Sequence, residues 1–168
     1  LNMYRLRAIV EIKPINCTVN CGLGPSSEVA YRDPRNQALG WRAYGTQDNE
    51  VIDWQALRVM HVIPETGIEL EPDRFILEMG FERLNGVDFK KGCYVGQEIV
   101  ARMKHKTLLR KGLRQVRVSG VTEPGTPILA NKKNAGVIYT QHGGLALAYL
   151  RFDRITGHMS AGNAIVTA

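Results

Sequence analysis

The side chains best placed for chemistry lie in one run, Lys90-Lys91-Gly92-Cys93-Tyr94-Val95-Gly96-Gln97-Glu98. Cys93 stands between two glycines, in a tight turn that is expected to open a helix at Gln97. The N–H groups of a helix start and the two lysines favour an anion, including a thiolate. The run therefore predicts a reactive Cys93 thiol. The alternative is a small buried apolar residue, which is how many free cysteines serve.

Glu98 falls in the first turn of the same predicted helix, where its carboxylate can accept hydrogen bonds from the N–H groups of a heterocycle. The other cysteines, Cys17 and Cys21, are one residue too far apart for a C-x-x-C element, and we interpret their spacing as incidental. The sequence has no P-loop, G-x-S-x-G, H-E-x-x-H or G-x-G-x-x-G motif. We therefore predict no metal site.

Composition is typical of a globular protein. The 168 residues are 44% hydrophobic, which is enough for one domain with a core or for two small ones. No apolar run is long enough to span a bilayer, and no stretch reads as a signal peptide. An odd number of cysteines, three, then favours free thiols in a reducing compartment.

Charge is unevenly distributed along a chain whose net charge is +6. Residues 50–98 contain ten acids and five bases, whereas residues 99–122 contain seven bases and no acid. The basic block is consistent with an anionic partner or with an ordinary solvated face.

Residue patterns up to position 106 predict a mixture of helices and strands. The chain should leave a helix and enter a strand over 8–12, then form loop over 14–27 and two strands, 28–31 and 38–44, around a turn at 33–36. A helix over 51–62 should be capped by Asp48 and ended by Pro64. Further helices are predicted over 75–84, ending at Asn85-Gly86, and over 97–103.

The remainder of the chain predicts a small antiparallel β-barrel or sandwich. Short apolar segments alternate with Gly, Pro or Asn turns at 113–118, 127–130, 136–139, 145–152 and 164–167. We expect the boundary between the two parts near residues 106–112.

Residues 91–98 resemble the K-G-C-Y-x-G-Q-E signature of the YgfZ-type folate-binding proteins, which are relatives of the glycine cleavage T-protein, an aminomethyltransferase. Further similarity lies at 1–10, 33–35, 39–42, 86–89, 101–103, 110–111 and 135–151, so it covers nearly the whole chain. The sequence departs from the family pattern at Val62, where a glycine is frequent, and at Lys106, where an arginine is frequent.

The resemblance implies an α+β fold class, with an α/β (ferredoxin-like) middle domain followed by a small antiparallel C-terminal β-barrel. It implies that residues 1–12 are the tail of an N-terminal folate-binding domain that is otherwise absent. Residues 13–108 would be the central α/β domain with the motif, and residues 109–168 the barrel domain.

The resemblance also implies a tetrahydrofolate-binding protein that assists the assembly or repair of iron–sulfur clusters. Cys93 would be its functional thiol, facing the folate cavity. The ligand-binding residues would be Lys91, Gly92, Tyr94, Gly96, Gln97, Glu98 and Arg102. Trp41 is a second candidate for an aromatic wall, and Lys104, Lys106, Arg110 and Lys111 are further candidates for the anionic folate tail.

Partners implied by the resemblance are folate and iron–sulfur client enzymes or cluster-assembly proteins. We expect no nucleic acid, no membrane and a monomer, in the cytoplasm or, in a eukaryote, the mitochondrial matrix. The indicated role is accessory rather than enzymatic. The alternative is an aminomethyltransferase of glycine cleavage. A nucleic-acid-binding module is disfavoured because residues 99–122 contain no Phe, Tyr or Trp for base stacking.

Overall fold

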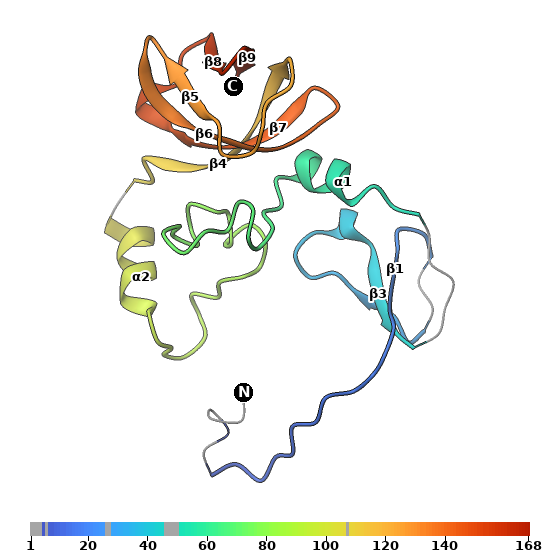
Figure 1. Cartoon of the computed structure of the whole chain (residues 1–168). Helices are drawn as coiled ribbons and strands as arrows, with labels where there is room; N and C mark the ends of the chain where they lie inside the picture. Colours follow the sequence, from blue (N-terminus) through green and yellow to red (C-terminus); the bar gives the residue numbers. More distant parts are fainter. Residues whose placement is uncertain (1–4, 6, 26–27, 46–50, 107) are drawn as a thin grey trace.

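The chain has two parts, an α/β part that ends at Lys106 and a closed β-barrel that begins at Lys111 (Figure 1). The computed structural model describes residues 5, 7–25, 28–45, 51–106 and 108–168. The α+β fold class with a C-terminal barrel is thereby confirmed. Neither α-helix of the described ranges is long and apolar enough to cross a bilayer.

A three-stranded antiparallel sheet lies in the first part, in the order β1 (Val19–Gly22), β3 (Trp41–Tyr44), β2 (Tyr31–Arg32). One face of it buries Asn20 and Ala43. The prediction of loop over 14–27 was wrong at β1, which lies in a stretch rich in Asn, Gly, Pro and Ser. The predicted strand 28–31 overlaps β2 only at Tyr31, and the predicted strand 38–44 is shorter than expected because a 3-10 turn, η2 (Gln37–Leu39), takes its start.

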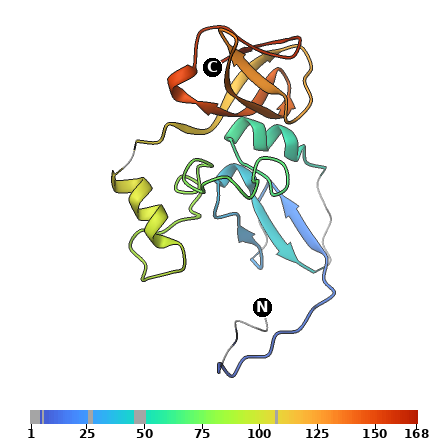
Figure 2. The same cartoon turned by 60° about the vertical axis from the view of Figure 1, so that its left-hand side comes forward.

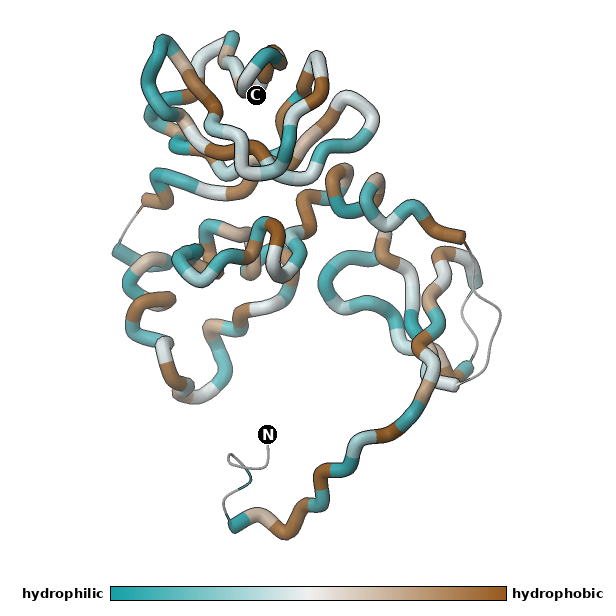
Figure 3. Tube along the Cα trace, in the orientation of Figure 1, coloured by the Kyte–Doolittle hydropathy of each residue, from teal (hydrophilic) through white to brown (hydrophobic). Residues whose placement is uncertain are grey.

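Residues 8–18 contain no strand, so the strand predicted over 8–12 is absent. The segment trails away from the sheet toward the N-terminus (Figures 1 and 3). Ile9 and Ile15 are exposed, so the alternation of apolar residues here has no packing partner among the described residues.

Helix α1 (Trp54–His61) confirms the predicted helix over 51–62, but it starts three residues later and ends one residue earlier. Its cap is Asp53, whose Oδ1 accepts a hydrogen bond of 2.8 Å from the Ala56 N–H. Asp48, the predicted cap, lies outside the described residues. The helix stops before Pro64, at Val62, which takes the left-handed conformation with φ of 54°.

The helix predicted over 75–84 was wrong, because these residues form a series of turns. Their hydrogen bonds do not keep one spacing: Met79 N–H donates to the Phe75 carbonyl at 3.2 Å, and Phe81 N–H donates to the Ile76 carbonyl at 3.1 Å. Gly80, with φ of 80°, interrupts the helical conformation between them. Leu77, Met79 and Leu84 are nevertheless buried.

Helix α2 (Gln97–Lys106) confirms the helix predicted over 97–103 and extends it. Gly96, with φ of 88°, forms the turn that precedes it, and Gln97 N–H donates to the Tyr94 carbonyl at 3.2 Å. The helix buries Val100 and leaves most of its other side chains exposed.

Six antiparallel strands close the barrel in the order β4-β7-β6-β5-β8-β9. They are β4 (Lys111–Ser119), β5 (Pro127–Ala130), β6 (Lys133–His142), β7 (Leu145–Arg151), β8 (Met159–Ala161) and β9 (Ala164–Thr167), with a 3-10 turn, η3 (Phe152–Arg154), after β7. All five predicted strands are present, and β8 is additional. Alternate residues point inward to a core that includes Val116, Ile128 and Ile138.

The barrel sits on α1 and on the turns of residues 65–81 (Figures 1 and 2). One buried cluster joins the two parts, with Val59 and Met79 from the first and Leu113, Tyr139, Leu147 and Tyr149 from the barrel. Leu113 N–H donates to the Glu78 carbonyl at 2.8 Å, and the Gln115 side chain donates to the Val59 carbonyl at 2.8 Å. Apolar packing and backbone hydrogen bonds therefore both fix the barrel in place.

Candidate functional site

The loop of residues 88–96, here called the motif arch, spans from the end of the buried turns to the start of α2. Its first end is tied by the Asp88 carboxylate, which accepts a hydrogen bond of 2.8 Å from the Lys90 N–H. Its last end is tied by the Gln97 side chain, whose Oε1 accepts from the Tyr94 N–H at 3.1 Å. The arch is thus held at both ends by side chains that the sequence places two or three residues away.

Aromatic contacts hold the arch against α2. The Phe89 ring lies 5.4 Å from the Lys104 ammonium and 6.3 Å from the centre of the His105 ring. The Lys91 ammonium lies 4.5 Å above the Tyr94 ring. Cation–π contacts of this kind stabilise exposed sites by about 0.5–1 kcal/mol each. The Phe89 contacts reach Lys104 and His105, which lie in the last turn of α2.

A hollow of about 400 Å³ lies between the motif arch and α2, and it is the hollow we refer to below. It is lined by Asp88, Phe89, Lys91, Tyr94, Gln97, Glu98 and Ala101. The structure therefore brings four of the predicted ligand residues together, Lys91, Tyr94, Gln97 and Glu98. Gly92, Gly96 and Arg102 do not line the hollow.

Cys93 is an exposed free thiol on the motif arch. The alternative that it is a small buried apolar residue is therefore wrong. It is not among the residues that line the hollow, although we expected it to face that cavity. The thiol thus meets solvent on the arch, between Lys91 and Tyr94, which both line the hollow.

The further candidates for folate binding lie outside the hollow. Trp41 is half-buried in β3, where its indole N–H donates to the Gly24 carbonyl at 3.1 Å. Lys104 forms an ion pair with Glu82, and Lys106 and Arg110 are exposed. Lys111 begins β4. Within the described ranges, no group of three or more His, Cys, Asp or Glu side chains is placed to hold a metal ion.

A larger cleft, of about 970 Å³, lies between α1 and the rim of the barrel. Its walls include Trp54, Arg58, Glu71, Tyr139 and His142, and none of the motif residues. Burial raises the pKa of the Tyr139 hydroxyl, which donates to the Glu71 carboxylate at 3.0 Å. The Tyr139 and Glu71 side chains are therefore bonded to each other within the cleft.

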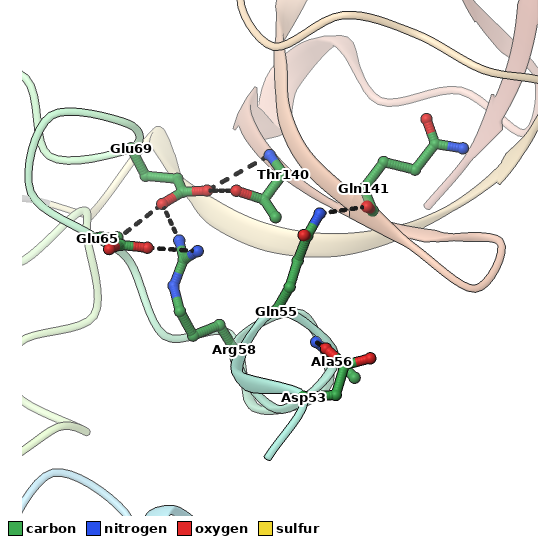
Figure 4. A network of polar contacts seen from close by, with 8 residues as sticks. All are labelled: Asp53, Gln55, Ala56, Arg58, Glu65, Glu69, Thr140 and Gln141. Carbon is green, nitrogen blue, oxygen red and sulfur yellow. Dashed lines mark hydrogen bonds and ion pairs between the residues drawn. The ribbon is translucent and has the colours of Figure 1, made fainter. Parts of the chain in front are cut away.

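Glu69 is the central group of the network beneath this cleft (Figure 4). Its side chain is fully buried and accepts hydrogen bonds from the Arg58 guanidinium, from the Glu65 N–H at 2.9 Å and from Thr140 of β6. Arg58 also pairs with Glu65 at 2.7 Å. We did not anticipate this network from the sequence, since Glu69 and Thr140 lie far apart along the chain and only the fold pairs them.

Comparisons with known proteins show what the chain is similar to. Residues 110–168 match the family described as the CAF17 C-terminal β-barrel domain. The human protein named iron-sulfur cluster assembly factor IBA57, mitochondrial, is 30% identical over 191 residues, which cover 94% of this chain and 53% of that protein. The Aliivibrio fischeri protein named tRNA-modifying protein YgfZ is 28% identical over 131 residues, which cover 77% of this chain and 39% of that protein.

A putative chloroplastic transferase of Arabidopsis thaliana is 31% identical over 93 residues, which cover 55% of this chain and 21% of that protein. The chain spans about half the length, 53%, of its human and mouse relatives. The similarity to the human relative includes the motif arch as well as the barrel, because it covers 94% of the chain.

Proposed function

This chain is a homologue of the IBA57 and YgfZ proteins and carries the C-terminal barrel of the CAF17 family, and from this we propose that it assists the assembly or repair of iron–sulfur clusters. The observation that carries the proposal is the exposed Cys93 thiol, which stands on an arch tied at both ends. An exposed thiol can reach a group on another protein, which a buried one cannot.

The proposed role of Cys93 is to bind an iron–sulfur cluster transiently while the cluster passes between two other proteins. Its sulfur, after loss of the thiol proton to water, donates an electron pair to an iron of the incoming cluster and displaces one existing ligand. A single thiolate cannot hold a cluster by itself, since clusters are held by several cysteines. The remaining ligands therefore stay with the delivering or receiving protein, and the Cys93 sulfur is released when that protein's ligand returns.

The proposed small-molecule ligand is a tetrahydrofolate bound in the hollow. A pterin ring needs an aromatic wall and an acceptor for its N–H groups, and Phe89, Tyr94 and Glu98 supply these. Lys91 and, beyond the hollow, Arg102 provide positive charge for the glutamate tail. The size fits, because the hollow of about 400 Å³ lies within the range of small-molecule pockets, roughly 300–1,000 Å³. Tetrahydrofolate supplies one-carbon chemistry when bound.

Complementation tests the role of Cys93. Cells that lack the endogenous protein and show low activity of an iron–sulfur dehydratase are supplied with this protein or with Cys93→Ala. We expect the unchanged protein to restore activity and Cys93→Ala to fail. Cys17→Ala is the matched control, because Cys17 is also a free cysteine but lies far from the motif arch in the sequence. Full rescue by Cys93→Ala would remove the thiol from the proposed function.

An aminomethyltransferase of glycine cleavage is a less favoured function. The human and bacterial relatives are named for cluster assembly and tRNA modification, and only the plant relative is named a putative transferase. Assay of methylene-tetrahydrofolate formation from the aminomethylated lipoyl carrier separates the two, and we expect no formation.

Direct binding of RNA is also tested, because the YgfZ relative is named a tRNA-modifying protein. We expect no specific tRNA binding in a filter assay with a salt series, since α2 is basic but carries no Phe, Tyr or Trp side chain for stacking. The proposed location is the cytoplasm, or the mitochondrial matrix in a eukaryote, as the name of the human relative suggests. We further propose that the protein is a monomer.

A further inference from the structure

The cleft between α1 and the barrel rim continues into a second space, and we propose that the two together bind an extended segment of a partner protein. That segment places a bulky apolar side chain in the second space and a basic side chain in the cleft. None of residues 88–98 lines either space, so the proposed roles of Cys93 and the hollow do not bear on this site.

The second space, here called the apolar pocket, has a volume of about 660 Å³ and lies between α1 and the turns of residues 63–86. Three side chains line both the apolar pocket and the cleft, namely Trp54, Arg58 and Glu65. The two spaces therefore adjoin and form one groove that passes Trp54.

The walls of the apolar pocket suit an aliphatic or aromatic side chain. Leu39, Ile63 and Leu84 form one buried cluster, and Phe81 is a partly buried wall. Arg35 also lines the pocket, but its Nε and Nη2 donate to the Asp33 carboxylate at 3.0 and 2.7 Å. An apolar side chain that enters is thus removed from water without having to bury a free charge.

The cleft has an excess of carboxylate groups. The Arg58 guanidinium pairs with Glu65 at 2.7 Å and also with the buried Glu69 (Figure 4). The Arg74 guanidinium pairs with Glu71 at 2.6 Å. Three carboxylates thus meet two guanidinium groups, and these guanidinium groups are already occupied. The local charge therefore favours a cation rather than an anion in the cleft.

Two of these carboxylates remain accessible to a ligand. The Glu65 and Glu71 side chains are 54% and 46% exposed, and each makes its closest contact with arginine through Oε2. Oε1 of each can therefore accept a hydrogen bond from an ammonium or guanidinium group. Trp54, which is 38% exposed, adds an aromatic face that attracts such a cation.

The size of the groove favours a peptide over a small molecule. The cleft alone, about 970 Å³, is at the upper end of the roughly 300–1,000 Å³ of small-molecule pockets, and the apolar pocket adds to it. Apolar walls on one side of Trp54 and carboxylates on the other suit two different side chains of one extended chain.

The test uses acetylated and amidated peptides in which zero to three glycines separate a leucine from a lysine. Isothermal titration calorimetry measures the dissociation constant. We expect at least one spacing to bind, and norleucine in place of its lysine to weaken binding about ten-fold, because norleucine keeps the carbon chain and lacks the ammonium group. Alanine in place of its leucine should weaken binding about ten-fold or more. Absence of binding at all four spacings, or equal binding of the lysine and norleucine peptides, would overturn the inference.

Variants of the protein locate the bound peptide. Thr66→Trp fills the apolar pocket from an exposed position and should abolish binding, whereas Thr66→Ser should bind as the parent does. Glu71→Gln should weaken binding of the lysine peptide several-fold and leave the norleucine peptide unchanged, a difference that a general structural change would not produce. Glu28→Gln, an exposed acid that lines neither space, is its control. Parent-like binding by Thr66→Trp, with an unchanged circular dichroism spectrum, would refute the site.

Other occupants give different results. Spermidine that binds as tightly as the best peptide would show that the cleft takes a small amine and would overturn the peptide proposal. Sedimentation that reveals a dimer abolished by Thr66→Trp would assign the groove to a second copy and would also overturn it. Cys93→Ala should bind the peptide as the parent does, so failure of this site and failure of the proposed thiol function are separate outcomes.

Discussion

Glu98 is a carboxylate that lines the hollow, four residues after Tyr94 in the sequence. We expect Glu98→Ala to weaken tetrahydrofolate binding about ten-fold or more, because hydrogen bonds to a charged acceptor are each worth about 1.5–3 kcal/mol. Isothermal titration calorimetry measures the dissociation constant. Glu123→Ala, an exposed acid in the barrel, is the control and should bind as the parent does. An unchanged affinity in Glu98→Ala would remove Glu98 from the site.

Asp33 is a buried carboxylate that holds the turn between β2 and β3. It accepts hydrogen bonds from Arg35 at 2.7 Å and Arg42 at 3.1 Å. The Arg35 hydrogen bond lowers the pKa of Asp33 to about 2. Because this pKa is depressed, the stabilisation is complete above the unfolded pKa of about 4 and is lost as the pH falls through about 2.

Asp33→Asn should therefore lower the free energy of unfolding by about 1–2 kcal/mol at pH 7, a value reduced for the solvent around the half-exposed Arg35. The difference between parent and variant should shrink between pH 4 and pH 2. Urea unfolding at pH 7, 4, 3 and 2 measures it. A difference that does not depend on pH would show that the charge of Asp33 does not stabilise the fold.

At the scale of elements, β6 and β7 approach each other closely at Gly136. A β-carbon added there would lie 2.2 Å from the Tyr149 carbonyl oxygen, a backbone atom that cannot move aside. We expect Gly136→Ala to destabilise the protein by about 1–3 kcal/mol, as overpacking does. The control is Gly157→Ala, whose added carbon meets nothing within 4 Å and should change stability little. Equal thermal midpoints for the two variants would contradict this account.

The sequence predicts elements well where local signals agree. Helix α2 and strands β5 and β9 were predicted because glycine or proline turns flank them and their side-chain period is clear. The prediction of a helix over 75–84 was wrong although the apolar spacing there is helical. The segment forms turns around Gly80 and packs in this form against the barrel at Leu113. Strand β1 lies in a stretch rich in turn-forming Asn, Gly, Pro and Ser, and strand β8 has only three residues.

The candidate site was predictable in part for the same reason. The motif places Lys91, Tyr94, Gln97 and Glu98 within eight consecutive residues, so local geometry brings them together. The position of the motif arch against α2 is not set by spacing alone. It depends also on the contacts of Phe89 with Lys104 and His105, which span some fifteen residues and which only the folded chain defines.

At the scale of the whole molecule, the buried Glu69 joins the α/β part to the barrel through Arg58 and Thr140 (Figure 4). We expect Glu69→Gln to lower the free energy of unfolding by about 3–5 kcal/mol, the cost of breaking a buried ion pair. Glu65→Gln removes the charge of the other carboxylate that pairs with Arg58. Because the Glu65 side chain is 54% accessible, this change should lower the free energy of unfolding by about 1 kcal/mol or less.

Urea unfolding followed by fluorescence and circular dichroism measures both variants. The parent should unfold in one transition, and Glu69→Gln should separate loss of the interface from loss of the barrel. Equal costs for the two glutamates would mean that burial of Glu69 does not strengthen the junction. This junction could not be predicted from the sequence, since it pairs residues 71 positions apart.

Closure of the barrel also determines which parts of the chain a protease should cleave. Every strand of the barrel is paired on both sides, so its backbone cannot enter the extended groove of trypsin without unfolding. The connection before β4 is different, because Lys106 and Arg110 are exposed and residues 108–110 belong to no helix or strand. Brief digestion should therefore cut after these bases, as well as after exposed bases of the first part such as Lys13 and Lys91, and leave a resistant C-terminal fragment, which mass spectrometry identifies by its new N-terminus at or just before Lys111.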